Sequence, residues 1–329
     1  MRQRPRAMDP EPQRSRWSDM ASESALYIGV DGGGSRCRAR IEDAQGRLLG
    51  EGASGPATTR LGVDKAWRSI MRACEAAAEQ AGVGPNDFAQ LHAGIGIAGL
   101  GRRGAEQALK DIAQPFRSVL FISDGLAACL GAHRGEDGAI VVAGTGSIGV
   151  GLIDGHELRF GGYGFPISDE GSGADIGLQA IRLALRASDG RGDRSALLDE
   201  VLAAFDHDPY QAVAWSEQAS ATDFAAFAPI VLRHASQGDP IGRRIFERAA
   251  DSIGDLLDMF LREGIERLSL VGGLAGAITP WLTPDLRDRL KPPDADAAAG
   301  AALAARQHIR IDDSRTLRQP WARFGMPNP

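Results

Sequence analysis

The chain has 329 residues, a length typical of two domains. With 43% hydrophobic residues and a formal net charge of −6, it is neither a disordered chain nor a protein with the broad basic face that nucleic acid or a membrane surface requires. Glycine is in excess, because the chain has 42 where an average near 7% would give about 23.

Residues 1–24 are predicted to be a disordered tail, because they combine five arginines, four acids and three prolines with almost no apolar periodicity. They lack the apolar stretch of a signal peptide and the acid-poor composition of a transit peptide. Met8 and Met20 are candidate native starts, since only five residues separate Met20 from the first expected strand. At the other end, residues 307–329 are expected to be a loosely ordered tail.

The first structured segment is predicted to be a three-stranded meander. An apolar run at 26–30 leads into the polar glycine turn 31–35, which at first looks like a dinucleotide-binding loop. Residues 36–42 then alternate charged and apolar side chains with a period of two, so a second strand follows where a Rossmann turn needs a helix. A third strand is expected at 47–53.

The next segments are predicted to alternate between helices and strands. Apolar residues recur every three or four positions from 63 to 81, which predicts an amphipathic helix with Cys74 on its buried stripe. A strand is expected at 91–98, a helix at 104–112, and a strand at 118–122 that ends at Ser123 and Asp124. A helix at 127–132 follows.

The opening pattern then returns. Residues 139–143 are predicted to form an apolar strand, 144–147 a polar glycine turn and 148–153 a second strand, and the Asp154-Gly155 hairpin leads to a third. Gly32 and Thr145 hold equivalent places about 113 residues apart. The chain is therefore predicted to contain an internal duplication.

The remaining chain is predicted to be mostly helical. The glycine-rich loop 161–173 precedes a helix at 174–185, and helical periodicity dominates 195–264. A strand at 267–271 stops at the glycines of 272–276, and an alanine-rich helix is expected at 296–306. The excess glycines are predicted to lie mostly in or beside ligand-contacting turns, with Gly149 and Gly151 among them.

Two glycine turns between antiparallel strands suit the binding of one polyphosphate, because their backbone N–H groups are open to phosphate oxygens. Asp31, at the end of the strand that enters the first turn, is placed to hold Mg²⁺ directly or through water. Alternatively, both turns are ordinary hairpins and Asp31 only caps its turn.

Three further carboxylates are candidate functional groups. Asp124 follows an apolar strand and precedes a helix, where it is either a helix N-cap or the base that takes a proton from a phosphoryl acceptor. Asp169 and Glu170 lie in the glycine-rich loop, where they are candidates to bind sugar hydroxyls or an amine. Otherwise these two belong to a solvated loop.

Several site classes are excluded. The cysteines Cys37, Cys74 and Cys129 are too widely spaced for a disulfide framework or a Cys-x-x-Cys metal site, and such usage is typical of a reducing cytoplasm. No run of 18 apolar residues occurs, so no membrane span is expected. The six histidines show no metal-ligand spacing, and no lysine stands in the Gly-x-x-x-x-Gly-Lys-Ser/Thr pattern of a P-loop.

The motifs in this order resemble the N-acetylglucosamine kinase and BadF-type ATPase branch of the actin-like ATPase and hexokinase superfamily, from about residue 26 to residue 305. The strings that carry the resemblance are Asp31-Gly-Gly-Gly-Ser35, Ser123-Asp124, Gly144-Thr-Gly-Ser147 and Ile167-Ser-Asp-Glu-Gly-Ser-Gly173. Shorter strings, such as Leu61-Gly62 and Cys129-Leu-Gly-Ala-His133, are similar to bacterial glucosamine kinases in particular.

The resemblance implies an α/β fold of two duplicated actin-like ATPase (ribonuclease H-like) domains, with mixed central sheets flanked by helices and a cleft between them. The expected domains are 25–134 and 135–293, and the helix 294–306 is expected to complete the first domain.

The resemblance also implies a role for each motif. The ATP phosphates would contact Gly32, Gly33, Gly34, Ser35, Gly144, Thr145, Gly146 and Ser147. Adenosine would contact Gly272, Gly273 and Leu274. The sugar would contact Thr58, Thr59, Asp124, Gly162, Tyr163, Gly164, Asp169 and Glu170. Asp124 would be the general base on the sugar 6-hydroxyl, and Asp31 would bind Mg²⁺.

The implied reaction is the transfer of the γ-phosphoryl group of Mg-ATP to the 6-hydroxyl of glucosamine, by a cytoplasmic enzyme that forms a homodimer. The chain departs from the family pattern at one expected sugar contact. Related kinases usually carry a sugar-contacting Asn in the segment 55–60, where this chain has Thr58 and Thr59. N-acetylglucosamine is therefore the alternative acceptor. A remoter alternative is an ATPase that activates a partner enzyme through an iron–sulfur cluster, for which Cys37 and Cys74 are expected to be too buried.

Overall fold

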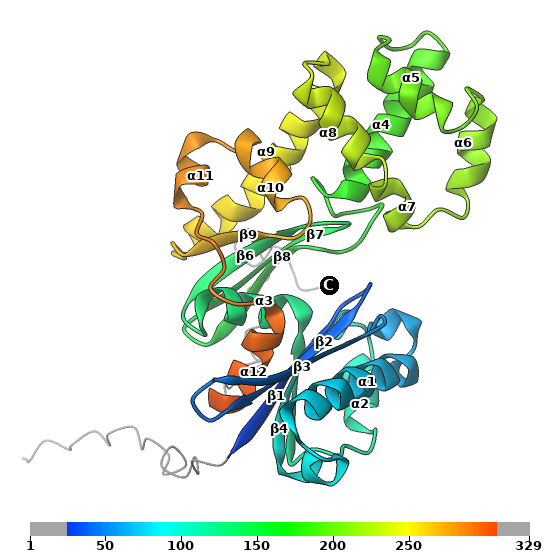
Figure 1. The fold of residues 1–329 in the computed structure, drawn as a ribbon. Coiled ribbons are helices and arrows are strands. Elements are labelled where there is room, and N and C mark those ends of the chain that lie inside the picture. Colours follow the sequence, from blue (N-terminus) through cyan, green and yellow to red (C-terminus); the bar gives the residue numbers. More distant parts are fainter. Residues whose placement is uncertain (1–24, 308–329) are drawn as a thin grey trace, which may run out of the picture.

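The computed structural model describes residues 25–307, which fold into two lobes that each contain one mixed sheet flanked by helices (Figure 1). The α/β fold with two mixed sheets that the sequence predicts is confirmed. The predicted tails at 1–24 and 308–329, and the candidate starts Met8 and Met20, lie outside the described residues. Gln307, which is predicted to begin the second tail, is instead the last residue of a helix.

The first lobe is built on a five-stranded sheet with the order β3-β2-β1-β4-β5. Its strands are β1 (Leu26–Gly32), β2 (Cys37–Asp43), β3 (Leu48–Ser54), β4 (Leu91–Ile97) and β5 (Ser118–Ser123). The first three strands form the predicted antiparallel meander, and β4 and β5 run parallel to β1. The glycine turn after β1 and the residues after β4 and β5 therefore meet at one edge of the sheet.

Helices cover both faces of this sheet. The amphipathic helix α1 (Val63–Ala81) packs on β2 and β3, and its buried stripe contains Ile70 and Cys74 as predicted. The short α2 (Ala105–Lys110) is two residues shorter at its C-terminal end than the periodicity suggests. The helix α3 (Asp124–His133) begins at Asp124, three residues earlier than expected, and follows β5 without a loop.

The second lobe repeats the strand order of the first. Its sheet, β8-β7-β6-β9, contains β6 (Gly138–Ala143), β7 (Ser147–Ile153), β8 (His156–Gly161) and β9 (Leu268–Val271). A fifth strand is reduced to a single parallel bridge between Leu268 and Leu290, supported by the bond from the Lys291 N–H to the Leu268 carbonyl at 2.8 Å. The predicted duplication is thus visible in the topology, with one edge strand almost lost.

The long helical insertion predicted at 195–264 lies between β8 and β9. It follows α4 (Gly173–Ser188) and consists of α5 (Ala196–Ala203), α6 (Pro209–Ser216), α7 (Ala221–Ala225), α8 (Ala228–Ser236) and α9 (Pro240–Arg262). Helices α10 (Ala275–Ile278) and α11 (Pro284–Arg289) follow β9. A continuous apolar core, which includes the fully buried Phe246 and Phe260, joins these helices to the sheet.

The last helix, α12 (Ala297–Gln307), returns to the first lobe and packs on β1, β4 and α3 (Figure 1). The contact is close because glycine and alanine face each other. A Cβ atom on Gly94 would lie 1.9 Å from the Ala301 carbonyl oxygen, and one on Gly29 would lie 2.0 Å from the Ala298 carbonyl oxygen. These glycines are required by backbone-to-backbone packing and not by a ligand.

Two glycines assigned to the ligand turns also have a packing role, which corrects the sequence-based prediction. Gly149 and Gly151 lie on β7 and face the Phe260 ring of α9, where added Cβ atoms would come within 2.6 and 2.8 Å of the ring. Their spacing of two residues puts both on the same face of the strand. The glycine excess therefore has two causes, and close helix-to-sheet packing is one of them.

The lobes share an apolar core around α3. Leu126 and Leu130 of α3 cluster with Ile140 and Val150 of the second sheet and with Ala301 of α12. This core holds the carboxyl ends of β1 and β5 in a defined position relative to the second lobe. In the range 25–307, no helix is both long and apolar enough to cross a membrane.

Candidate active site

The first glycine turn lies at the carboxyl end of β1. The Gly33 N–H donates to the Arg36 carbonyl at 3.0 Å and closes the turn, and the Gly32 carbonyl accepts from the Ala98 N–H at 2.8 Å. Gly34 and Ser35 are exposed, and a Cβ atom on Gly34 would meet no atom within 4 Å. The backbone at Gly34 is therefore open to a ligand.

Thr58 and Thr59, the predicted sugar ligands, lie beside this turn but are buried. The Thr58 hydroxyl donates to the Ala98 carbonyl at 3.2 Å, and the Thr59 hydroxyl donates to the Gly99 carbonyl at 2.7 Å. Both hydroxyl hydrogens are thus used within the chain, so either side chain can contact a sugar only as an acceptor. These two hydrogen bonds could not be predicted from the sequence, because their carbonyl acceptors lie about 40 residues away along the chain.

Asp31 forms an ion pair with Arg38, whose Nη2 lies 2.9 Å from Asp31 Oδ2. Among the described residues Oδ1 of Asp31 has no hydrogen-bond partner, and no group of three or more His, Cys, Asp or Glu residues gathers into a metal cluster. One open carboxylate oxygen beside an open glycine turn fits Mg²⁺, which is commonly bound by one or two carboxylates together with phosphate oxygens.

Asp124 begins α3 at the same sheet edge. The N-cap of this helix is Ser123, whose Oγ accepts from the Leu126 N–H at 3.0 Å, so the alternative that Asp124 is the cap is wrong. The Asp124 carboxyl is partly buried, and desolvation raises its pKa above the ordinary range of an aspartic acid. The N–H of Gly125 opposes this rise, Asp31 adds to it, and Arg159 opposes it. A carboxyl held in this way is suited to accept a proton.

The second glycine turn is tied to the glycine-rich loop that follows β8. The Gly173 N–H donates to the Gly144 carbonyl at 2.8 Å, and the Ala174 N–H donates to the Thr145 carbonyl at 3.2 Å. The Ser147 hydroxyl donates to the Glu170 carbonyl at 2.7 Å. Two segments that the sequence marks separately, for phosphate and for sugar, are therefore one hydrogen-bonded unit.

Asp169 lies where this loop meets the second turn. Its backbone has a φ of 70°, a conformation that is uncommon for residues other than glycine and is found at functional sites. Asp169 Oδ1 accepts from the Gly164 N–H at 3.1 Å, and a Cβ atom on Gly146 would lie 2.5 Å from Oδ2. Desolvation raises the pKa of Asp169, while backbone N–H groups and the positive charge of Arg60 lower it.

The segment predicted to contact adenosine adjoins the same turn. The Leu274 N–H donates to the Ala143 carbonyl at 2.9 Å, which places the end of β9 against the end of β6. Gly273 has open space where a Cβ atom would be. The structure thus gathers the turn 144–147, Asp169 and residues 272–274 around the carboxyl end of the second sheet.

Two arginines that no sequence motif marks, Arg159 and Arg60, also lie at this site. Arg159 of β8 donates from Nη2 to the Gly162 carbonyl, its guanidinium lies 5.9 Å from the centre of the Tyr163 ring, and its charge acts on Asp124. Arg60 reaches from the first lobe to the loop, where its Nη2 would lie 3.6 Å from a Cβ atom on Gly164. The sequence does offer a signal for Arg159, because it lies two residues before the glycine-rich loop at the end of a predicted strand.

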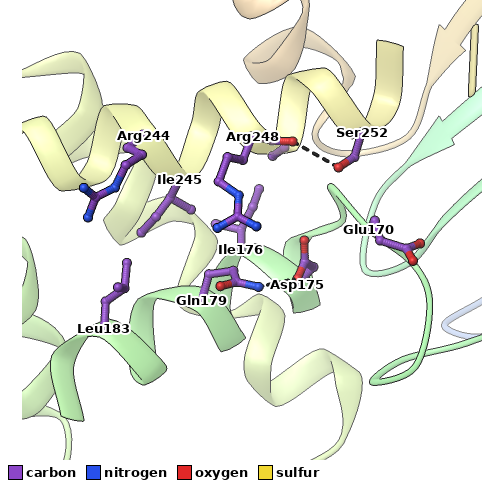
Figure 2. Close-up of a pocket in the computed structure, with 10 residues that line it drawn as sticks. Glu170, Asp175, Ile176, Gln179, Leu183, Arg244, Ile245, Arg248 and Ser252 are labelled. Atoms are coloured by element: carbon purple, nitrogen blue, oxygen red, sulfur yellow. Dashed lines mark hydrogen bonds between the residues drawn. The ribbon is translucent and has the colours of Figure 1, made fainter. Parts of the chain in front are cut away.

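Tyr163 and Glu170 are less enclosed than the other predicted sugar ligands. Tyr163 is 78% exposed. Glu170 is exposed, accepts from the Ser168 hydroxyl at 3.2 Å, and lines a cavity between α4 and α9 (Figure 2). Neither side chain contacts Asp124 or Asp31 through a hydrogen bond in the described part of the chain.

A family model described as the BadF/BadG/BcrA/BcrD ATPase family matches residues 28–305, which include both turns, Asp124 and Asp169. The chain belongs to this ATPase family. Membership implies the use of ATP, in agreement with the first glycine turn, which is open at Gly34.

Relatives of this chain include named sugar kinases. The chain is 43% identical to the glucosamine kinase GspK of Vibrio cholerae, in an alignment that spans 85% of this chain and 95% of that protein. It is 29% identical to the N-acetylmuramic acid/N-acetylglucosamine kinase of Clostridium acetobutylicum over 68% of this chain and 75% of that protein. A crystal structure from Chromobacterium violaceum, provisionally named an N-acetylglucosamine kinase, superposes with a TM-score of 0.80 at 34% identity and covers 86% of this chain and 100% of that one.

The substitution Gly34→Ala tests the first turn. We expect the KM for ATP to rise about tenfold, because an added methyl group would hinder approach of a phosphate oxygen to the backbone N–H groups. The sugar KM and the melting temperature should stay unchanged, since the Cβ atom meets no protein atom. The KM for ATP is measured by steady-state kinetics at varied ATP concentration. An unchanged KM would show that this turn does not bind the nucleotide.

Proposed function

We propose that the chain is an ATP-dependent glucosamine kinase, which forms glucosamine 6-phosphate and ADP. The observation that carries the proposal is Asp124, a partly buried carboxyl with a raised pKa at the sheet edge that also carries the first glycine turn. The 43% identity to a glucosamine kinase over nearly the whole of that protein supports the same reaction.

In the proposed reaction Asp124 accepts the proton of the sugar 6-hydroxyl. The resulting oxygen nucleophile forms a bond to the γ-phosphorus of ATP while the bond to the β,γ-bridging oxygen breaks, and ADP carries that electron pair away. Bound Mg²⁺, held through Asp31, would neutralise phosphate charge. The remaining work of the chain is to orient the two substrates and to exclude water, which limits hydrolysis of ATP.

The proposed nucleotide contacts are the backbone of the two turns, Gly32–Ser35 and Gly144–Ser147, and Gly272, Gly273 and Leu274. Backbone N–H groups in such turns bind phosphate without a side chain in the way. The support for this assignment is that the first turn is open at Gly34 and that Leu274 is hydrogen-bonded to the strand that enters the second turn. We also propose a domain boundary near residues 134–135, between α3 and β6, with α12 completing the first domain.

Glucosamine is proposed as the acceptor because its amine is largely cationic near neutral pH and Asp169 offers a carboxylate. Asp169 is held by the Gly164 N–H at the start of the loop, which leaves Oδ2 turned toward the second turn. Thr58, Thr59, Gly162, Tyr163, Gly164 and Glu170 are retained as proposed sugar contacts. The two threonines would serve through their oxygen atoms, since their hydrogens are donated elsewhere.

An ATP-coupled assay with glucosamine, with N-acetylglucosamine and without sugar tests this proposal. We expect kcat/KM to be at least about tenfold higher for glucosamine, and Asp169→Asn to lower that preference by weakening contact with the cationic amine. Predominant turnover of N-acetylglucosamine would contradict the acceptor assignment, and this second candidate is favoured by the names of the Clostridium and Chromobacterium relatives.

Hydrolysis of ATP that does not depend on sugar would point instead to an ATPase that activates a partner through an iron–sulfur cluster. The cysteines disfavour that function. Cys37, Cys74 and Cys129 are all buried, and desolvation raises the pKa of Cys37 and of Cys129 to about 12, so neither is a ready thiolate ligand. A cytoplasmic location and a homodimer remain proposals that follow from the resemblance to related kinases.

A further inference from the structure

A cavity of about 320 Å³ lies between α4 and α9 in the second lobe. Figure 2 shows side chains of the two helices facing each other across it, with Glu170 of the glycine-rich loop at one end. The floor is apolar, because Ile176, Ile245 and Ala249 are almost fully buried there. The walls carry polar groups from both helices, namely Asp175, Gln179, Arg244, Arg248 and Ser252.

Some of the charged side chains in the walls have hydrogen-bond partners and others do not. Asp175 is engaged, since it accepts from the Gly171 N–H at 3.0 Å and from Gln179 Nε2 at 3.3 Å. Arg244 and Arg248 lie one helical turn apart, and within residues 25–307 neither guanidinium has an ion pair or hydrogen bond. By contrast Arg243, the adjacent residue, lies 3.9 Å from a Glu247 oxygen and over the Trp281 ring. One wall of the cavity therefore carries two exposed guanidinium groups without an ion pair to the described residues, and the lining also includes the carboxylates of Asp175 and Glu170.

We propose that this cavity is a regulatory site for a hexosamine phosphate. Paired guanidinium groups bind phosphate through several charge-assisted hydrogen bonds, and the second amide hydrogen of Gln179, which Asp175 does not accept, adds a neutral donor beside them. The apolar floor suits one face of a sugar ring, and the Glu170 carboxylate at the end of the cavity suits an amine. A hexosamine phosphate is the product of the proposed reaction, so this choice of ligand rests on the proposed function.

Hydrogen bonds and close packing connect the cavity to the candidate active site. Glu170, at its end, belongs to the loop segment 168–172, which also carries Asp169. The Glu170 carbonyl accepts from the Ser147 hydroxyl, and the Gly171 N–H is bound by Asp175 of the cavity wall. Gly171 also packs so closely on α9 that a Cβ atom there would lie 2.5 Å from the Ala249 carbonyl oxygen. A ligand that moves Glu170 or Asp175 would thus alter the sugar loop, and the coupling between the two sites is reciprocal.

The test is calorimetric titration of the full chain with glucosamine 6-phosphate, glucose 6-phosphate and inorganic phosphate. Each titration is done with the protein alone and in the presence of excess glucosamine and a non-hydrolysable ATP analogue. We expect glucosamine 6-phosphate still to bind when these are present, and the double variant Arg244→Ala/Arg248→Ala to weaken that binding by about tenfold or more. Glucose 6-phosphate, which lacks the amine, should bind more weakly than glucosamine 6-phosphate.

The matched control is Arg243→Ala/Arg262→Ala, which removes the same charge from the same helix outside the cavity lining and should not change the affinity. In the kinase assay, added glucosamine 6-phosphate should lower kcat of the parent enzyme but not of the cavity variant. Equal affinity in the parent and the cavity variant, or purely competitive inhibition that the substitutions leave unchanged, overturns the proposal. Lack of kinase activity in the parent would instead refute the proposed function, while the titration still decides whether the cavity binds phosphate.

Discussion

Asp124→Asn is expected to lower kcat by about 10²–10⁴ while ATP binding is retained. The amide is nearly isosteric with the carboxyl but cannot accept the proton of the sugar hydroxyl, so only the chemical step should suffer. Single-turnover kinetics and titration with an ATP analogue separate the two quantities. Turnover within a few-fold of the parent would remove Asp124 from the role of base.

The same substitution should not destabilise the fold. Because desolvation raises the pKa of Asp124 in the folded state, the charged carboxylate opposes folding at neutral pH. The stabilising contribution of this group is fully present below its unfolded-state pKa of about 3.9 and is lost as pH rises through the higher folded-state value. Asn carries no charge, so the melting temperature of the variant at pH 7 should equal or exceed that of the parent.

Thermal denaturation measured from about pH 4 up to neutral pH checks this sign, and the activity of the parent should fall as pH drops through the raised pKa of Asp124. A variant that is inactive and also clearly less stable at neutral pH would mean that Asp124 has a structural role.

Gly94→Ala is expected to destabilise the protein by at least about 3 kcal/mol, a loss of roughly 6 °C or more in melting temperature. The new methyl group would lie 1.9 Å from the Ala301 carbonyl oxygen, an overlap between two backbones that no side-chain rotation can relieve. Relief requires α12 to move away from β1 and β4, which would also open the packing around Gly29.

The matched control for Gly94→Ala is Gly34→Ala, because a Cβ atom on Gly34 meets nothing within 4 Å. The two variants add the same atom to the same lobe, one inside the packed sheet and one in the open turn. Calorimetry should show a large loss of stability only for the first. Similar melting temperatures for both variants would contradict the close packing of α12 on the sheet.

Local periodicity predicted most of the fold. The alternation in 36–42 and the three-to-four-residue spacing in 63–81 gave β2 and α1 within one residue at each end. These patterns are reliable because each element buries one face or stripe against a sheet. The repeated strand-turn-strand pattern around Gly32 and Thr145 likewise predicted the shared strand order of the two sheets.

Long-range packing could not be predicted in the same way. The prediction that Gly149 and Gly151 belong to ligand turns is wrong because composition cannot distinguish a glycine that faces an aromatic ring from one that faces a phosphate. The buried hydrogen bonds of Thr58 and Thr59 and the contact of Arg60 with the loop of the other lobe depend on segments brought together only by the tertiary fold. The cavity between α4 and α9 has no sequence signature for the same reason.

The most direct test of the central claim is ³¹P NMR of the products formed from ATP and glucosamine by the parent protein and by Asp124→Asn. The proposed reaction predicts stoichiometric ADP and a phosphomonoester resonance of glucosamine 6-phosphate with the parent, and almost none with the variant. Formation of ADP and inorganic phosphate without a sugar phosphate would contradict phosphoryl transfer to the sugar.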